Sequence, residues 1–223
     1  MRLVLASRNA HKLRELRVLM APHELVALPD GVNLPPETGS TFTDNALAKA
    51  RAAAAATGEP ALADDSGIEA SALGGAPGIG SARYAGERAG DEENLAKLLR
   101  AVPPGGDTRV AYVAALVLVR PDGAEIAVEG RCAGSLTHEP RGEGGFGYDP
   151  AFVPADRDDG RTMAELSVEE KDAISHRGRA ARALLARVEA IEGGHCPPSQ
   201  PPEGTRGGHR PPSQPPRQEG GSR

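Results

Sequence analysis

The sequence predicts an α/β fold around a mixed β-sheet flanked by helices, and two patterns support that prediction. Apolar runs at 2–6 and 61–63 lie next to segments with helical spacing, an arrangement that favours parallel strands. The apolar run at 109–119, a turn at 121–123 and an alternating run at 125–134 indicate an antiparallel hairpin. With 223 residues, the chain is long enough for one sizeable α/β domain or for two lobes that share a core.

The first strand ends in a polar turn, and a helix is expected at about 10–20 with Leu13, Leu16 and Met20 at helical spacing. Such a turn leaves backbone N–H groups and the positive end of a helix facing a ligand. Lys12 lies in the first turn, where a cation opposes the helix dipole unless an anion is also present. Phosphate binding at this turn and a solvated helix with an incidental lysine are both open interpretations.

The next segment, 23–36, is expected to be irregular because prolines interrupt it. A helix follows at about 42–57, with Thr41 as its N-cap and Gly58 as its stop. Glu37 stands just before this helix. It is a solvated loop acid by default and becomes important only if a metal ion lies near it.

An acidic stretch is the most informative part of the chain. The apolar residues 61–63 lead to Asp64 and Asp65, which are followed by Ser66 and Gly67. This pattern predicts a buried strand with two carboxylates at its end, where ligands bind in an α/β sheet. Carboxylate oxygens there suit Mg²⁺. The alternative is a strand that runs into an Asx turn.

Two glycine-rich loops follow. The first, at 73–86, is expected to hold its backbone tightly against a neighbour, and its Arg83 either reaches an anion or pairs with a nearby carboxylate. The second, at 142–152, brings two aromatic residues and an acid together within 146–149. A loop of this kind either closes over the flat ring of a ligand or seals the end of the core.

Three helices complete the predicted elements. One is expected at about 91–100, and a short one begins near Ser167, which forms a capping box with Glu170. The last helix places His176 and Arg177 in its first turn. Its expected buried line is Ala180, Leu184, Val188 and Ile191.

Cations at the starts of two helices form a further pattern. His176 and Arg177 repeat the placement of Lys12, in each case against the helix dipole. A polyanionic ligand explains three such cations better than chance does.

Composition excludes several classes of function. The net charge is −5 and no Lys- or Arg-rich run occurs, so nucleic acid is not an expected partner. No apolar stretch approaches membrane-spanning length, and the N-terminal apolar run is too short for a signal peptide, so a cytoplasmic location is expected. The tail at 193–223 is rich in Pro and Gly, carries an imperfect repeat and is expected to be disordered. Because Cys196 lies in that tail, a disulfide with Cys132 is not expected.

Four stretches, taken in order, resemble one family, the inosine/xanthosine triphosphatases or noncanonical purine nucleoside triphosphate pyrophosphatases (RdgB/Ham1-like). The stretches are Ser7-Arg8-Asn9 with Lys12 and Glu15, Asp64-Asp65-Ser66-Gly67 with Pro77-Gly78 and Ser81-Ala82-Arg83-Tyr84, Phe146-Gly147-Tyr148-Asp149-Pro150, and Lys171 with Ser175-His176-Arg177. The resemblance covers about 2–192 and excludes the tail.

The resemblance implies a two-lobed α/β fold around a long mixed sheet, over a domain at 1–192. It also implies a homodimer that uses Mg²⁺ and has neither nucleic acid nor membrane as a partner. The implied reaction is hydrolysis of dITP, ITP, XTP or dXTP between the α- and β-phosphates, which releases the monophosphate and pyrophosphate.

Carried onto the matching residues, the resemblance implies that Asp65 binds the metal and accepts the proton of the attacking water. Glu37 is implied as the second metal ligand, and Asp64 is expected to keep Asp65 ionised and oriented. The residues implied to bind substrate are Ser7, Arg8, Asn9, Ala10, His11, Lys12, Ser66, Phe146, Gly147, Tyr148, Asp149, Lys171, His176 and Arg177. A metal with Lys and Arg donors is what phosphoryl transfer chiefly needs.

Gly80 departs from the family pattern, which has an aromatic residue before Ser81, so a looser loop is expected at 77–86. Two other functions are compatible with the motifs. One is a Maf-like pyrophosphatase that acts on pyrimidine or modified nucleotides. The other is a protein that binds nucleotides without catalysis, although such a binder has no need of a carboxylate that activates water.

Overall fold

The structure is a computed structural model that describes residues 1–193, and the rest of the tail predicted to be disordered lies outside the described residues. Its sheet has six strands in the order β2-β1-β3-β4-β5-β6. β1 pairs in parallel with β2 and β3, and every later pairing is antiparallel. The predicted mixed sheet is therefore confirmed. The strands are β1 (Arg2–Leu5), β2 (Glu24–Val26), β3 (Ala61–Ala70), β4 (Arg109–Val119), β5 (Glu125–Leu136) and β6 (Phe152–Pro154).

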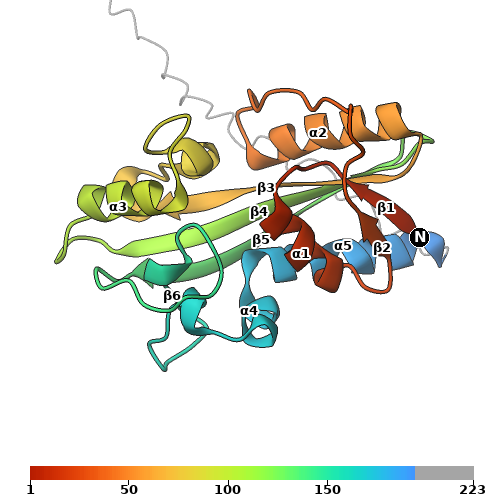
Figure 1. Ribbon diagram of the computed structural model, residues 1–223. Helices are drawn as coiled ribbons and strands as arrows, with labels where there is room; N and C mark the ends of the chain where they lie inside the picture. Colours follow the sequence, from red (N-terminus) through yellow and green to blue (C-terminus); the bar gives the residue numbers. More distant parts are fainter. Residues whose placement is uncertain (194–223) are drawn as a thin grey trace, which may run out of the picture.

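Helices cover both faces of the sheet (Figure 1). The α-helices of the described chain are α1 (Ala10–Leu19), α2 (Phe42–Thr57), α3 (Asp91–Ala101), α4 (Val168–Ile174) and α5 (His176–Glu192). The long strands β3, β4 and β5 join the end of the molecule that carries α1, α2 and α5 to the end that carries α3 and β6. No helix within residues 1–193 is both long and apolar enough to cross a membrane.

The helix α2 has the ends that its sequence predicts. The Thr41 hydroxyl accepts a hydrogen bond from the Asp44 N–H, and the Asp44 carboxylate accepts one from the Thr41 N–H. Gly58 ends the helix at φ 67°, a conformation that favours glycine. The alanine-rich face of α2 packs on one face of the sheet with Phe42 and Ala63.

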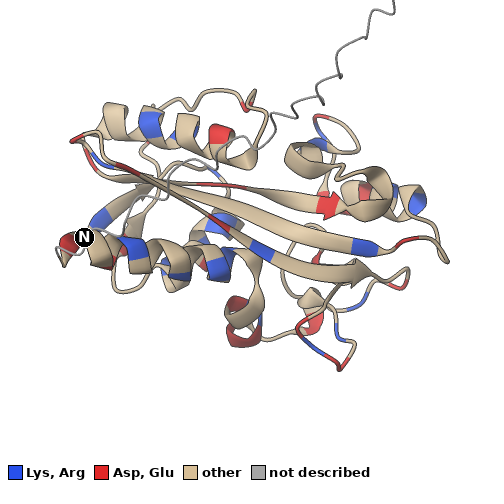
Figure 2. Ribbon diagram, turned by 180° about the vertical axis from the view of Figure 1, so that it is seen from behind, with Lys and Arg blue, Asp and Glu red and all other residues tan. Residues whose placement is uncertain are grey.

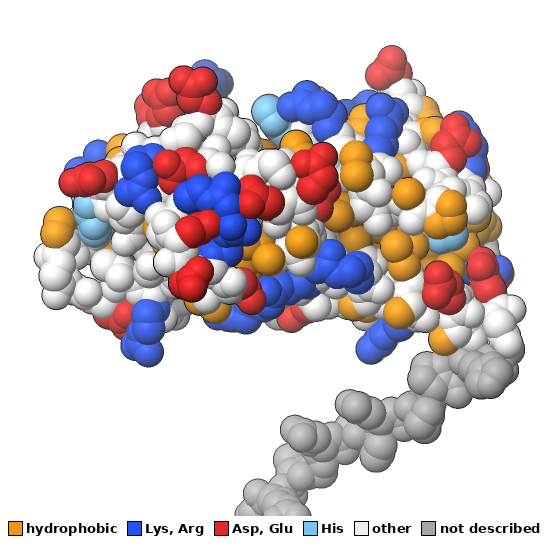
Figure 3. Space-filling model, turned by 90° about the horizontal axis from the view of Figure 1, so that it is seen from below, with side chains coloured by type: hydrophobic (Ala, Val, Ile, Leu, Met, Phe, Trp, Pro, Cys, Tyr) orange, Lys and Arg blue, Asp and Glu red, His pale blue; other side chains and the backbone are white. Residues whose placement is uncertain are grey.

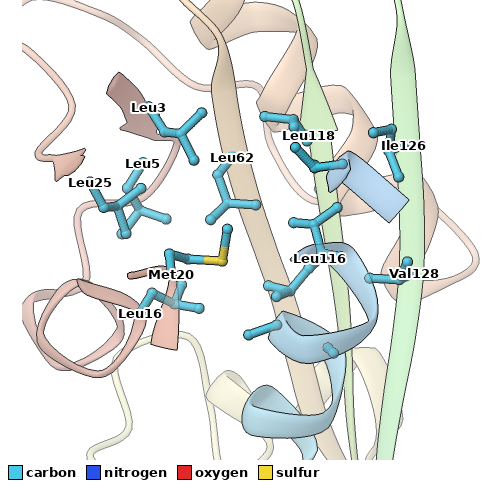
Figure 4. Packing of buried hydrophobic residues seen from close by; sticks show 14 of the residues in the cluster. Leu3, Leu5, Leu16, Met20, Leu25, Leu62, Leu116, Leu118, Ile126 and Val128 are labelled. Carbon is cyan, nitrogen blue, oxygen red and sulfur yellow. The ribbon is translucent and has the colours of Figure 1, made fainter. Parts of the chain in front are cut away.

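On the opposite face, α1 and α5 pack against aliphatic side chains of the strands (Figure 4). Leu16 and Met20 pack beside Leu62 and Leu116, as the helical spacing predicts. Ile191 is a correction, because 48% of it is exposed near the C-terminal end of α5, beyond the strands. The other three residues of that predicted line are buried.

Two local features differ from, or add to, the sequence prediction. The segment 23–36 contains the short strand β2, because edge pairing with β1 supplies the hydrogen bonds that a local pattern does not reveal. The loop 73–86 contains a 3-10 helix (Gly78–Arg83), which is held by hydrogen bonds from the Ile68 N–H to Ser81 Oγ (2.8 Å) and from Ser81 Oγ to the Gly78 carbonyl (2.6 Å). A Cβ on Gly80 would have no neighbour within 4 Å, so the looser loop stays a prediction.

Candidate active site

The candidate active site lies at an open edge of the sheet. β1 ends at Leu5, which pairs with Leu62 near the start of β3. β3 continues to Ala70, and beyond Leu62 its ladder partners among the described strands come from β4 alone. The predicted position of Asp64 and Asp65 at a strand end is therefore wrong. They lie within β3, and it is the end of the shorter neighbouring strand that opens this edge.

The alternation of side chains along β3 separates the two acids, because successive residues of a strand point to opposite faces. Asp65 faces α2, where Asn45 Nδ2 donates a hydrogen bond to Oδ2 at 3.1 Å. Asp64 faces α1 and α5, and its oxygens accept hydrogen bonds from Lys12 and Arg177. The adjacent carboxylates thus belong to two different groups of side chains.

The Asp65 group is built around one ammonium. Lys49 Nζ lies 3.0 Å from Asp65 Oδ1, 2.7 Å from Glu37 Oε1 and 3.0 Å from the Asp64 carbonyl oxygen. Arg83 Nη1 lies 3.4 Å from Glu37 Oε2. Burial and the nearby negative charge of Glu37 raise the pKa of Asp65, and Lys49 offsets this only in part. A carboxylate with a raised pKa is suited to accept a proton.

Asp64 itself is fully buried, and the side chains around it are rich in cations. Arg177 Nε lies 3.1 Å from Asp64 Oδ2, Lys12 Nζ bonds Oδ1, and Ser66 Oγ donates to Oδ1 at 3.0 Å. Arg177 Nη2 also donates to Ser66 Oγ at 2.7 Å. Burial opposes the charge of Asp64, but Arg177 and Lys12 outweigh it and hold the pKa of this carboxyl far below its usual range.

This arrangement adds a role for Asp64, and its expected effect on Asp65 stays a prediction, since Lys12, which Asp64 holds, lowers the pKa of Asp65. The Asp64 side chain contacts none of the groups that bond the Asp65 carboxylate; it holds Lys12 and Arg177 in place. Glu15 on α1 adds a second anion, at 3.0 Å from Arg177 and 2.7 Å from Lys171. The cations at the helix starts are therefore paired with carboxylates of the protein itself.

His176 does not belong among those cations. It is 4% exposed, and burial together with the charge of Arg177 lowers its pKa well below the usual value, so the imidazole is neutral. Its Nδ1 has no hydrogen-bond partner within residues 1–193. The first turn of α5 lies directly on β5 at Gly130, where a Cβ would clash with the His176 carbonyl oxygen.

The cations face a cleft of about 310 Å³ that several predicted substrate-binding residues line. Phe146 lies at this cleft, with Lys171 Nζ 5.3 Å and the Arg177 guanidinium carbon 5.2 Å from the centre of its ring. The centre of the His11 ring lies 5.1 Å from the centre of the Phe146 ring. Asp149 Oδ2 accepts hydrogen bonds from Lys171 at 2.8 Å and from the Phe146 N–H at 2.9 Å.

The other predicted residues of the second loop, Gly147 and Tyr148, also line the cleft and are anchored to its opposite wall. The Gly147 N–H donates to Asp91 Oδ2 at 2.8 Å, and the Tyr148 hydroxyl donates to the Ser81 carbonyl at 2.7 Å. These two contacts attach the loop to α3 and to the 3-10 helix at 78–83.

The N-terminal turn, 7–12, is only partly turned toward the cleft. Asn9, His11 and Lys12 line it. Asn9 Oδ1 caps α1 by accepting hydrogen bonds from the N–H groups of His11 and Lys12. The expectation that backbone N–H groups of this turn are free for a ligand is therefore wrong for these two. Ser7 Oγ accepts from the Asn9 N–H, and Ala10 is the first residue of α1. Arg8 points elsewhere, since its guanidinium donates to carbonyl oxygens of the 28–32 loop.

Sequence reasoning missed three buried members of the site: Asn45, Lys49 and Tyr112. Asn45 and Lys49 stand four residues apart on α2, beside an alanine face that packs on the sheet. Two polar residues along the buried border of an otherwise alanine-rich helix are the signal that could have revealed them. Tyr112 carries no such signal, because an aromatic residue in an apolar strand is typical of a core.

The geometry also identifies where a divalent cation would fit. Glu37 and Asp65 both approach the Lys49 ammonium, and the charge of Glu37 raises the pKa of Asp65. A bound cation would relieve this repulsion between the two carboxylates. Two carboxylates are a usual share for Mg²⁺, which completes its shell with water and phosphate oxygens. Among residues 1–193, no cluster of three or more His, Cys, Asp or Glu side chains is arranged to hold a metal.

Charged side chains are otherwise mixed over the surface. Figure 2 shows basic segments along α5 and acidic ones on neighbouring elements, and the face seen from below in Figure 3 carries both signs together with apolar side chains. The face drawn in Figure 3 therefore shows no broad surface of one charge sign among the described residues.

Comparisons with known proteins agree with this architecture. The model of the Ham1 family matches residues 3–187. A dITP/XTP pyrophosphatase of Streptomyces coelicolor is 49% identical over 200 residues, which cover 86% of this chain and 99% of the relative. A dITP/XTP pyrophosphatase of Frankia alni is 54% identical over 204 residues, with 86% and 98% covered.

A solved structure shows the same fold. The Ham1 protein of Staphylococcus aureus superimposes with a TM-score of 0.76 at 39% identity, covering 86% of this chain and 100% of that one. The sheet, the helices on its two faces and the family match over most of the chain lead to one conclusion. The chain is a member of the Ham1 family.

Proposed function

We propose that the cleft and the Asp65 group beside it together hydrolyse dITP, ITP, XTP or dXTP between the α- and β-phosphates, with Mg²⁺ as cofactor. Curated relatives that are about half identical to this chain are named dITP/XTP pyrophosphatase. The chain is accordingly a nucleoside triphosphate pyrophosphatase, and those names favour noncanonical purine substrates over the pyrimidine alternative.

One observation supports the mechanism. The sheet edge has two carboxylates on one side, which would bind a metal and a water, and a cluster of cations on the other side, which would bind an anion. On the α2 side, Glu37 and Asp65 would hold Mg²⁺, which when bound would neutralise phosphate charge and lower the pKa of a water. Asp65 would accept the proton of the attacking water. Lys49 would keep both carboxylates ionised and oriented.

On the other side, Lys12 and Arg177 are fixed by Asp64, and Lys171 is fixed by Glu15 and Asp149. Side chains held in this way are preorganised, so they lose little freedom when they bind a polyanion. Phosphoryl transfer requires this positioning and charge neutralisation more than it requires covalent chemistry.

The base would lie toward Phe146, where an aromatic ring offers a stacking surface. A site that donates hydrogen bonds to a 6-oxo group rejects a 6-amino group, because a donor would then face a donor. The neutral His176 and the charged Arg177 both line this part of the cleft. Guanine also has a 6-oxo group, so its exclusion requires a further contact.

A panel of substrates tests the proposal. Pyrophosphate release should be rapid from the triphosphates of inosine, deoxyinosine and xanthosine, slow from ATP and pyrimidine triphosphates, and dependent on added Mg²⁺. Faster release from a pyrimidine triphosphate would favour the Maf-like alternative, and tight binding without release would favour a non-catalytic protein.

A homodimer and a cytoplasmic location are further parts of the proposal, and the family resemblance is their support. Light scattering on the purified protein measures the mass in solution. A monomeric mass at micromolar concentration would contradict the homodimer.

A further inference from the structure

Tyr112 is a buried group that the mechanism above leaves unused. It lies on β4, the strand between β3 and β5, and only 6% of it is exposed. Its ring lines the cleft, yet its hydroxyl points to a partner within the protein. The residue therefore links the central strand β4 to the wall of the cleft.

The hydroxyl of Tyr112 completes the hydrogen bonding of Asp149. It donates to Oδ1 at 3.0 Å, while Oδ2 accepts from Lys171 and from the Phe146 N–H. Asp149 is 3% exposed, so losing one donor would leave a buried carboxylate oxygen without a partner. Burial raises the pKa of Tyr112 well above 10, which keeps its hydroxyl protonated and able to donate.

The ring of Tyr112 holds a second residue of the cleft. It stacks on His176 with ring centres 4.6 Å apart and an angle of 14° between the planes. Its other ring neighbour is Phe152, at 4.5 Å and 25°. This stacking fixes the orientation of the His176 imidazole. The buried Nδ1 of that ring has no hydrogen-bond partner within residues 1–193.

We propose that Tyr112 is a positioning residue for the base-binding end of the cleft, where it orients Asp149 through its hydroxyl and His176 through its ring. The inference rests on the proposed function, because it assigns that end of the cleft to a purine base. The Asp65 group has no contact with Tyr112 among the described hydrogen bonds and ring pairs. Asp149 also bonds Lys171 of the cation cluster, so the main effect of Tyr112 falls on base recognition and a smaller one on anion binding.

The substitution Tyr112→Phe tests this role, because it keeps the ring and removes the donor. We expect the dissociation constant of inosine monophosphate, measured by calorimetry, to rise about 10-fold, because Asp149 without this donor must be oriented again when the base binds. The dissociation constant of pyrophosphate, which has no base and senses Asp149 only through Lys171, should rise less than about 3-fold. The KM for inosine triphosphate should rise about as much, with a smaller change in kcat.

Two further variants separate positioning from a structural effect. In an Asp149→Asn background, adding Tyr112→Phe should weaken inosine monophosphate binding less than about 3-fold, since the partner is already altered. Tyr84→Phe, a tyrosine outside the cleft lining, is the matched control and should leave both dissociation constants unchanged. If Tyr112→Phe does not fold, Asp149→Asn alone must show the base-selective loss.

The outcomes are distinct. Equal weakening of inosine monophosphate and pyrophosphate, or no weakening of either, would overturn the positioning role, as would full additivity of the two substitutions. A wild-type enzyme that releases no pyrophosphate from inosine triphosphate would overturn the proposed function itself.

Discussion

Replacing Asp64 with Asn removes the charge that holds the cation cluster together. The side chain is fully buried, Lys12 is 15% exposed and Arg177 is 5% exposed, so solvent screens these pairs little. The substitution keeps the shape of the side chain. It leaves Lys12 with no carboxylate partner among the described ion pairs, whereas Arg177 keeps Glu15.

The magnitude follows from that difference between the two cations. Breaking a buried pair by removing one partner costs about 3–5 kcal/mol of the free energy of unfolding. Because Arg177 retains an anion, we expect the lower end, about 3 kcal/mol. Urea denaturation at pH 7 measures it. The matched control is Asp107→Asn, which removes the partner of Arg109 and should cost far less, because solvent screens this pair.

The pH dependence of the stability difference between wild type and Asp64→Asn gives an independent check. The pKa of Asp64 is lowered in the folded protein, so its stabilising contribution is complete above the unfolded pKa of about 4 and is lost as the pH falls toward the folded value. The gap between wild type and Asp64→Asn should be constant above about pH 5 and narrow below about pH 4. A loss at pH 7 no greater than that of the Asp107→Asn control would refute the reasoning.

Three further substitutions test other parts of the site. Lys49→Met leaves Glu37 and Asp65 facing each other without their shared cation, so the free energy of unfolding of the metal-free protein should fall by about 3 kcal/mol. Mg²⁺ should then raise the melting temperature of this variant more than that of wild type, and equal shifts would contradict this. Glu37→Gln should raise the Mg²⁺ concentration for half-maximal pyrophosphate release about 10-fold, and an unchanged requirement would exclude Glu37 as a ligand. Gly67→Ala places a Cβ against the Gly78 carbonyl and should cost about 2 kcal/mol in urea denaturation, whereas wild-type stability would show that the 3-10 helix gives way.

The sequence predicts those elements whose local signals agree with the final packing. Thr41 and Gly58 give both ends of α2, and the alternation at 125–134 gives most of β5. β2 escapes prediction because its hydrogen bonds come from β1, and the exposure of Ile191 depends on where the sheet ends beneath α5. These are properties of the assembled fold.

The candidate site shows the same division. Asp65 and Glu37 lie beside the same ammonium, as their shared role in the resemblance implies, and that role itself stays a prediction. The opposite orientations of Asp64 and Asp65 follow from the alternation of side chains once β3 is known to continue past them, and that continuation depends on pairing with β4. The neutral state of His176 follows from its burial, which the first turn of a helix does not reveal.

The central claim is that Asp65, on the Glu37 side of the sheet edge, activates the attacking water. Pyrophosphate release from inosine triphosphate by Asp65→Asn, at saturating Mg²⁺ and substrate, tests it most directly. We expect a kcat at least about 100-fold below wild type, the usual contribution of a general base, with the folded structure retained. A kcat within about 3-fold of wild type would contradict it.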